Sequence, residues 1–337
     1  MSDELKVETV IDGLHKISVP TPFLVGRVNV YLVEGPTLTL VDTGPNSGTS
    51  LDSLDRSVTS LGFDLDDIGE VVLTHQHVDH VGLARIVANR SGAPVTMPAA
   101  LGPYLADWNH SADLDDEMAA SVMKTNGLDG RVTQAVKQVA RAYRAFGATV
   151  EAGRLISDGD SITIGSIEMT AYSRPGHSPT DTIFVCDETG LMIGGDHLLP
   201  KVSSNPVLSR VMASDGNTDT LERFQSLPAY IESLKKTREM TLGTVLPGHG
   251  DAFDDHVKLI DERLAMTDDR MEKMLASLSD GPLTALEVAG HIWGAVAAAQ
   301  PFLTFSEVIG HMDILKEHNL VEEASPDKQG VIRFIQL

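Results

Sequence analysis

The chain reads His75-Gln76-His77-Val78-Asp79-His80 one residue after a short apolar run, EVVL at residues 70–73. Such a run is typical of a buried strand, so we expect the loop that follows it to lie at one rim of a sheet. The loop holds three imidazoles and a carboxylate and contains no thiol. Imidazole and carboxylate groups suit zinc, iron or manganese. One histidine would mean little, but four potential ligands at this spacing predict a metal site.

Three further potential ligands stand where other predicted strands end. His177 follows the strand MTAYS, Asp196 follows LMIG, and His249 follows TVL. Each lies beside glycine or proline, and glycine lets the backbone approach a metal closely. His197, next to Asp196, is a candidate for contact with a substrate. Together with the histidine-rich loop, these side chains suffice for two coordination spheres.

This arrangement resembles the metallo-β-lactamase superfamily over about residues 10–280. The superfamily's His-x-His-x-Asp-His motif is matched in full, and its later ligands are matched by His177, Asp196 and His249. Its early aspartate is matched by Asp42 in the sequence VDTG. The resemblance implies an α+β fold, a four-layer αββα sandwich with two metals at one edge.

The resemblance also implies a role for each ligand. The first metal is bound by His75, His77 and His177, the second by Asp79, His80 and His249, with Asp196 bridging the two and Asp42 orienting the site from behind the ligands. We expect two divalent ions, with Zn²⁺ favoured and Mn²⁺ or Fe²⁺ as alternatives, because histidine-rich sites accept all three.

Two adjacent cations predict a hydrolase. They stabilise hydroxide near neutral pH, so a bridging hydroxide can attack an electrophilic carbonyl or phosphorus atom. Catalytic roles are expected for Asp79, Asp196 and His197. The redox branch of the superfamily has a glutamate where His77 stands, which favours hydrolysis here. We expect a small carbonyl substrate: a thioester such as an acyl-CoA, a lactone or another ester.

Three other functions stay open. A metal-dependent endoribonuclease or phosphodiesterase would use the same ligands. A mononuclear-iron oxygenase branch of the superfamily also carries the histidine-rich motif. A non-catalytic binding protein of this fold is disfavoured, because such a protein would be expected to have lost ligands.

Composition narrows these choices. The 337 residues include 26 basic and 48 acidic side chains, a net charge of −22, which repels phosphate backbones at long range and disfavours nucleic acid as a partner. A hydrophobic content of 42% predicts a globular protein with a substantial core, and a single cysteine excludes a disulfide scaffold. The first residues lack the pattern of a secretory signal, and no apolar run reaches the length of a membrane span. We therefore expect a cytoplasmic protein with no membrane association.

The length predicts about two domains. Residues 1–280 are expected to form the catalytic domain, and residues 98–147 to form a helical lid inserted into it. Trp108 and other large apolar side chains of the lid are candidates for a pocket lining. The lid also carries basic residues, and a solvated helix face is favoured over phosphate binding for them, namely Arg131, Lys137, Arg141 and Arg144.

Residues 281–337 read as helices followed by a hairpin, and they resemble the winged-helix extension of lactamase-beta-2-like and glyoxalase-II-like hydrolases. Residues 282–337 hold three basic and seven acidic side chains, a net charge of −4. A domain built to hold phosphates would be basic. We therefore expect this tail to pack against the catalytic domain or to form a homodimer contact, and to wall the substrate cleft.

Overall fold

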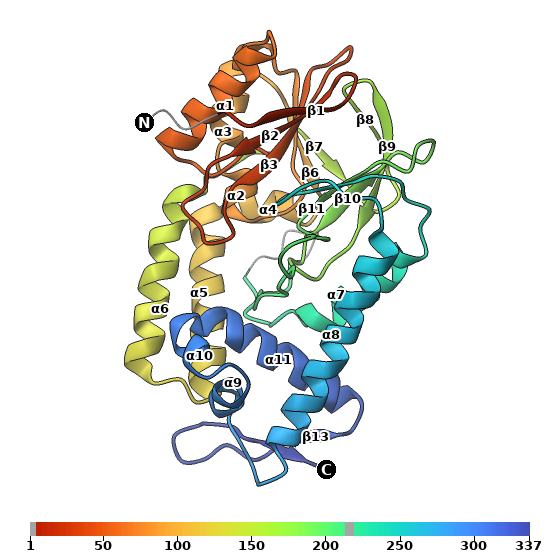
Figure 1. The fold of residues 1–337 in the computed structure, drawn as a ribbon. Coiled ribbons are helices and arrows are strands. Elements are labelled where there is room, and N and C mark those ends of the chain that lie inside the picture. Colours follow the sequence, from red (N-terminus) through yellow and green to blue (C-terminus); the bar gives the residue numbers. More distant parts are fainter. Residues whose placement is uncertain (1–4, 213–218) are drawn as a thin grey trace.

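Two β-sheets lie face to face and carry helices on their outer faces (Figure 1). The structure is a computed structural model that describes residues 5–212 and 219–337, with the backbone alone at residues 298 and 299. The first sheet has seven strands in sequence order, antiparallel from β1 to β4 and parallel from β4 to β7. Its strands are β1 (Val7–Ile11), β2 (Leu14–Val19), β3 (Val28–Val33), β4 (Thr39–Val41), β5 (Glu70–Val72), β6 (Val95–Pro98) and β7 (Arg154–Ile156).

The second sheet has five strands in the order β12-β11-β10-β9-β8. The pairs β8–β9, β9–β10 and β10–β11 are antiparallel, whereas β12 runs parallel to β11. Its strands are β8 (Ser161–Ile164), β9 (Ile167–Ser173), β10 (Thr182–Val185), β11 (Met192–Gly195) and β12 (Val245–Pro247).

Alternation along β3 shows how the layers are built. Val30 and Leu32 pack toward helices α1 (Gly48–Ser60) and α3 (Ala84–Ser91), while Tyr31 and Val33 join the core between the sheets. Successive side chains of a strand point to opposite faces, so a strand buried on both sides is apolar at nearly every position. On the other side, helices α7 (Ser226–Arg238) and α8 (His256–Ser277) cover the second sheet. The predicted αββα sandwich is thus observed.

Helices fill the connection between β6 and β7, where the sequence predicts an insertion. They are α4 (Leu101–Ala106), α5 (Trp108–Thr125), α6 (Gly130–Tyr143) and the 3₁₀ turn η2 (Arg144–Phe146). Figure 1 shows α5 and α6 running away from the sheets toward the C-terminal helices. Two short elements lie earlier in the chain: η1 (Leu65–Asp67) and α2 (Val78–Val81).

The C-terminal segment shares its core with the rest of the protein. Its elements are α9 (Ala285–Trp293), α10 (Ala295–Ala299), α11 (Pro301–Glu317), β13 (Val321–Glu323) and β14 (Phe334–Gln336). Val288 and Phe305 pack in one cluster with Met118 and Met123 of α5 and with Met274 of α8. Apolar contacts therefore cross the predicted boundary at residue 280, and they join the tail to the helical insertion.

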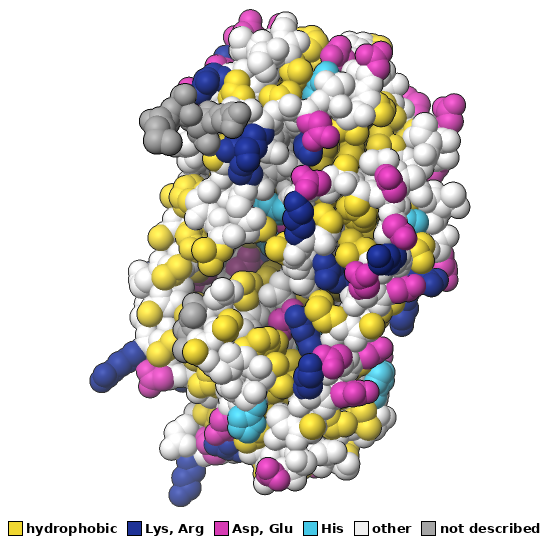
Figure 2. All heavy atoms as spheres, viewed as in Figure 1, with side chains coloured by type: hydrophobic (Ala, Val, Ile, Leu, Met, Phe, Trp, Pro, Cys, Tyr) yellow, Lys and Arg dark blue, Asp and Glu magenta, His cyan; other side chains and the backbone are white. Residues whose placement is uncertain are grey.

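The face of the molecule drawn in Figure 2 carries its charges in a dispersed pattern. Figure 2 shows basic and acidic side chains spread over the viewed face, with no broad basic patch on it. Among the described residues, no helix combines the length and the apolar character that crossing a membrane requires.

Candidate metal centre

The predicted ligands come from loops that lie together at one edge of the sandwich. The histidine-rich loop follows β5 and leads into α2, whose first turn holds Asp79 and His80. His177 lies between β9 and β10, Asp196 directly follows β11, and His249 lies two residues beyond β12. Strand ends at one edge of a sandwich bring residues that are distant in sequence close together, so the three separate loops meet the histidine-rich loop.

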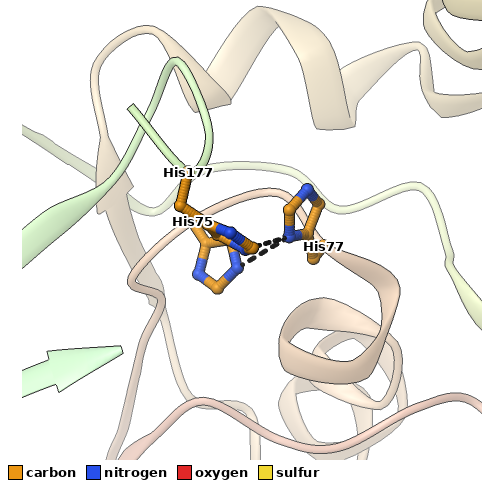
Figure 3. A group of neighbouring side chains, drawn as sticks. All are labelled: His75, His77 and His177. Carbon is orange, nitrogen blue, oxygen red and sulfur yellow. Dashed lines mark hydrogen bonds between the residues drawn. The ribbon is translucent and has the colours of Figure 1, made fainter. Parts of the chain in front are cut away.

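Three imidazoles face one another at the first end of the cluster (Figure 3). The Nδ1 atom of His77 lies 3.1 Å from Nε2 of His75 and 2.8 Å from Nε2 of His177. Burial and, to a lesser extent, the neighbouring His177 lower the pKa of His77 to about 3, and burial also lowers the pKa of His75 well below its usual value. Both rings are therefore neutral, the form of histidine that binds metals.

The second group contains Asp79, His80 and His249. The Nε2 atom of His249 lies 3.3 Å from Oδ2 of Asp79. Burial alone would lower the pKa of His80, but the carboxylates of Asp196 and Asp42 raise it well above its usual value. Carboxylates that stabilise a proton so strongly make this end of the cluster attractive to a cation.

Asp196 lies between the two groups. Its Oδ1 atom lies 3.4 Å from Nε2 of His80, and its Oδ2 atom lies 3.5 Å from Nε2 of both His177 and His249. It also forms a third possible ligand group with His75 and His80. One carboxylate thus faces ligands of both groups, as the bridging role inferred from the resemblance requires.

Buried polar atoms without partners show that the cluster fits metal ions. Nε2 of His80, Oδ1 of Asp196 and Nε2 of His249 are buried and make no hydrogen bond. Unpaired buried polar atoms are costly and rare, and a coordinated cation would satisfy all three. A Cβ atom on Gly248 would lie only 2.2 Å from Oδ1 of Asp196, so glycine is needed at this close approach. The histidine and aspartate clusters therefore indicate divalent-metal binding.

The outward-facing ring nitrogens are held by the surrounding protein. Nδ1 of His177 lies 3.0 Å from the Asn205 carbonyl oxygen, and Nδ1 of His249 lies 2.8 Å from the Arg27 carbonyl oxygen. Such contacts hold a ligating imidazole in one tautomer and one orientation. Sequence reasoning missed both partners, because a backbone carbonyl can be supplied by any residue and leaves no signal in the sequence.

Asp42 contacts His80 directly and His75 through Thr74. Its Oδ2 atom lies 2.7 Å from Nδ1 of His80 and accepts a hydrogen bond of 2.8 Å from Oγ1 of Thr74. The same threonine oxygen lies 2.9 Å from Nδ1 of His75. Thr74 was not among the predicted residues, although its place between the strand and the first histidine is a usable signal.

His197 lies apart from the cluster. Its side chain is fully buried, and its Nε2 atom lies 2.8 Å from the hydroxyl oxygen of Thr237 on α7. The ring packs edge-on against Tyr230, and it does not belong to the cavity that adjoins the cluster. The catalytic role of His197 stays a prediction, and this placement favours packing behind the site.

A cavity of about 720 Å³ opens onto the cluster. Five of the predicted ligands contribute to its wall: His77, Asp79, His177, Asp196 and His249. Most of the rest of the wall comes from the loop between β2 and β3, from α5, from the segment after β11 and from the C-terminal helices, with single residues from α4 and α8. Figure 2 shows the viewed face hollowed between the sandwich above and the C-terminal helices below. A cavity of this size holds a small organic molecule.

Comparisons with known proteins agree with this geometry. The model of the metallo-beta-lactamase superfamily matches residues 24–249. The chain is 32% identical over 305 residues to Probable metallo-hydrolase YqjP of Bacillus subtilis strain 168, covering 90% of this chain and 92% of that protein. It is 23% identical over 291 residues to the Beta-lactamase-like protein 2 homolog of Caenorhabditis elegans, covering 85% and 78%. The crystal structure of a metallo-beta-lactamase family protein from Thermus thermophilus shares the fold, with a TM-score of 0.81 at 23% identity, covering 98% of this chain and 100% of that one.

Proposed function

The chain belongs to the metallo-beta-lactamase superfamily, and from this premise we propose that it is a binuclear metal-dependent hydrolase of a small carbonyl substrate. The substrate class is a thioester, a lactone or another ester. One observation carries the proposal: the intact histidine and aspartate cluster forms part of the wall of a cavity large enough for a small molecule. The name of the Bacillus subtilis relative, a metallo-hydrolase, supports the reaction type.

We assign two divalent ions to the cluster and favour zinc. His75, His77 and His177 would hold one ion, and Asp79, His80 and His249 would hold the other, with Asp196 between them. When bound, the two ions would supply Lewis acidity and lower the pKa of water, so that a nucleophile is available near neutral pH.

The chain's own residues position the reactants. Asp79 borders the cavity, where its carboxylate can orient a water molecule and accept its proton. His77 and His177 form part of the same wall, and the hydrogen bond between Nδ1 of His177 and the Asn205 carbonyl oxygen limits the movement of His177. A cysteine nucleophile is excluded, because Cys186 is the single cysteine of the sequence and lies buried in the core between the sheets.

Charge disfavours the nuclease alternative. The cationic side chain in the cavity wall, Arg270, donates a hydrogen bond of 3.0 Å to Oε2 of Glu307. In the helical insertion, Arg144 is likewise paired with Asp113 and Asp116. Phosphate-binding proteins present basic side chains to their ligand, and these pairs neutralise them.

The finer family relationship is also part of the proposal. We place the chain near the lactamase-beta-2-like hydrolases, to which its likeness to the Caenorhabditis elegans protein lends support. In this reading, residues 98–147 act as a lid, and residues 281–337 form a winged-helix-like extension that walls the cleft. Trp108 of α5 and Phe302 of α11 line the same cavity, which supports both roles.

Metal analysis combined with an activity panel tests the function. Purified protein is analysed for zinc, manganese and iron, and then assayed with acyl thioesters, lactones, nitrophenyl esters and labelled single-stranded RNA. We expect two metal equivalents per chain, turnover of a carbonyl substrate that a chelator abolishes, and intact RNA. Cleavage of RNA, together with no turnover of any ester, thioester or lactone, would establish the nuclease alternative. One iron equivalent with oxygen uptake would establish the oxygenase, and metal-loaded protein that turns over nothing would support a binding protein.

A further inference from the structure

We propose that the cavity selects substrates with an uncharged, apolar acyl chain, and that helices α10 and α11 determine the length of chain it accepts. The proposal rests on the hydrolase function above and names the substrate class of the same site. It follows from the lining of the cavity, from the position of its apolar residues and from the pairing of its charges.

The cavity extends from the metal cluster to the C-terminal helices. Its wall includes His77 and Asp196 of the cluster and, from the tail, Trp293, Phe302 and Leu303. Trp108 of α5 also contributes. A substrate whose carbonyl group lies at the cluster therefore has an apolar space for the remainder of the molecule, and the far wall of that space is made by the tail.

Exposed apolar side chains gather around this cavity. Leu24, in the loop between β2 and β3, is 91% exposed. Four other cavity-lining residues belong to the exposed large hydrophobic side chains of the described chain: Val25, Val202, Val296 and Leu303. Exposed apolar groups that cluster, unlike single ones, mark binding sites. The entrance is thus suited to an apolar ligand.

The charged side chains that line the cavity outside the metal cluster are paired. Arg270 binds Glu307, as described above. Asp115 accepts hydrogen bonds of 2.7 Å from both Nε of Arg210 and the hydroxyl of Tyr104. A charged group on the acyl chain of a substrate would find no unpaired opposite charge among these residues, and the cost of removing it from water would not be compensated. The cavity therefore favours an uncharged chain.

Tryptophan fluorescence gives a direct test, because the chain has two tryptophans, Trp108 and Trp293, and both line the cavity. We would titrate straight-chain 2-butanone, 2-octanone and 2-dodecanone into metal-free and zinc-loaded protein. These ketones resemble esters and cannot be hydrolysed. We expect saturable changes in emission, with Kd falling about fourfold for each added methylene until the cavity is full. Binding that does not depend on chain length would overturn the proposal.

Two variants test whether the alkyl chain of the ligand contacts the C-terminal helices. Leu303→Ala and Phe302→Ala should each weaken 2-dodecanone binding by about fivefold or more, because apolar contact area is lost, and should leave 2-butanone binding unchanged. Leu303 is partly exposed, so its replacement tests the proposal even if Phe302→Ala fails to fold. The control is Val139→Ala, which shortens an exposed side chain on α6 outside the cavity. Equal losses for short and long ketones would overturn the assignment to α11.

Nitrophenyl esters of the same chain lengths separate this inference from the proposed function. Both the inference and the hydrolase function are supported if turnover rises with the length of the acyl chain in the wild type and loses that dependence in Leu303→Ala. Turnover without any dependence on chain length overturns the inference and leaves the hydrolase. Ketone binding with no turnover of any ester overturns the hydrolase and leaves the apolar site.

Discussion

The Nδ1 atom of His80 lies 2.7 Å from the Oδ2 atom of Asp42, and both side chains are buried. The backbone of Asp42 has a φ of 57°, a left-handed conformation that is uncommon outside glycine, although asparagine and aspartate adopt it more readily than other residues. Such a conformation is costly and persists where the surroundings hold it. Here the Asp42 carboxylate is held by two hydrogen bonds, which the backbone N–H and the hydroxyl of Thr74 donate.

Replacing this carboxylate should weaken metal binding without removing a ligand. We expect Asp42→Ala to lower zinc affinity by roughly 10- to 100-fold, because His80 loses the partner that orients its ring. Asp42→Asn should lose less of the zinc affinity, since asparagine keeps an acceptor oxygen and tolerates the positive φ. Competition with a colorimetric chelator measures both, with the exposed Glu188→Gln as the control. Unchanged affinity in Asp42→Ala would show that His80 needs no such partner.

Asp196→Ala should reduce the binding of both metals. The Asp196 carboxylate faces His80 and His249 of one group and His177 of the other, so its loss removes negative charge and a ligand from each. Metal content per chain after dialysis is the measurement, and nearly all activity should disappear with it. Asp187→Ala, on the protein surface, should keep both metals. A fully active Asp196→Ala would overturn the bridging assignment.

Gly248→Ala should disrupt the cluster through a single added methyl group. The new Cβ would lie 2.2 Å from Oδ1 of Asp196 and 2.7 Å from Cε1 of His80, so one of these groups must move. We expect lower metal content and little activity while the fold is kept, as seen by circular dichroism. Gly130→Ala is the matched control, because a Cβ there meets nothing within 4 Å. A Gly248→Ala protein with normal metal content would mean that the loop adjusts freely.

Stability should fall in mild acid because of His311 on α11. Its Nδ1 atom lies 2.7 Å from the Glu307 carbonyl oxygen, and its Nε2 atom is buried without a hydrogen-bond partner. Burial lowers the pKa of His311 to about 4. The folded state therefore favours the neutral ring, and this contribution is fully present above pH 6.5 and lost as the pH falls from 6.5 toward 4.

Urea unfolding at pH 7.5 and pH 5 measures this effect. For a pKa of 6.5 unfolded and about 4 folded, the free energy of unfolding should fall by about 2 kcal/mol between these pH values. In His311→Gln the free energy of unfolding should no longer fall by this amount between the two pH values, whereas the exposed His318→Gln should show the same fall as the wild type. The carboxyl pKa of Glu307 is raised by burial and acts in the opposite direction, so the comparison between variants isolates the histidine. Equal acid sensitivity in His311→Gln and the wild type would contradict the prediction.

The superfamily was predictable from the sequence because its evidence is local. Strands β5, β11 and β12 are short and largely apolar, whereas β9 is longer and has polar residues among its apolar ones. Each of the four is followed within a few residues by histidine or aspartate. A strand followed by a turn delivers those side chains to a sheet edge whatever the rest of the chain does. The helical insertion was visible for the same reason, since residues 101–143 lack runs of β-branched residues.

Long-range packing decided what the sequence left open. His197 is adjacent to Asp196 yet turns to Thr237, because consecutive residues after a strand point in different directions. The tail reads as a separate unit, but Phe305 shares a core with Met118 and Met274 from two other helices. The cavity wall joins the β2–β3 loop, α5 and α11, which are far apart along the chain. The sequence by itself determined the kinds of ligand and their places at strand ends, since both follow from local pattern. Only the tertiary structure decided which nitrogen faces which carboxylate and which helices line the cavity, because these depend on contacts between segments that no local pattern encodes.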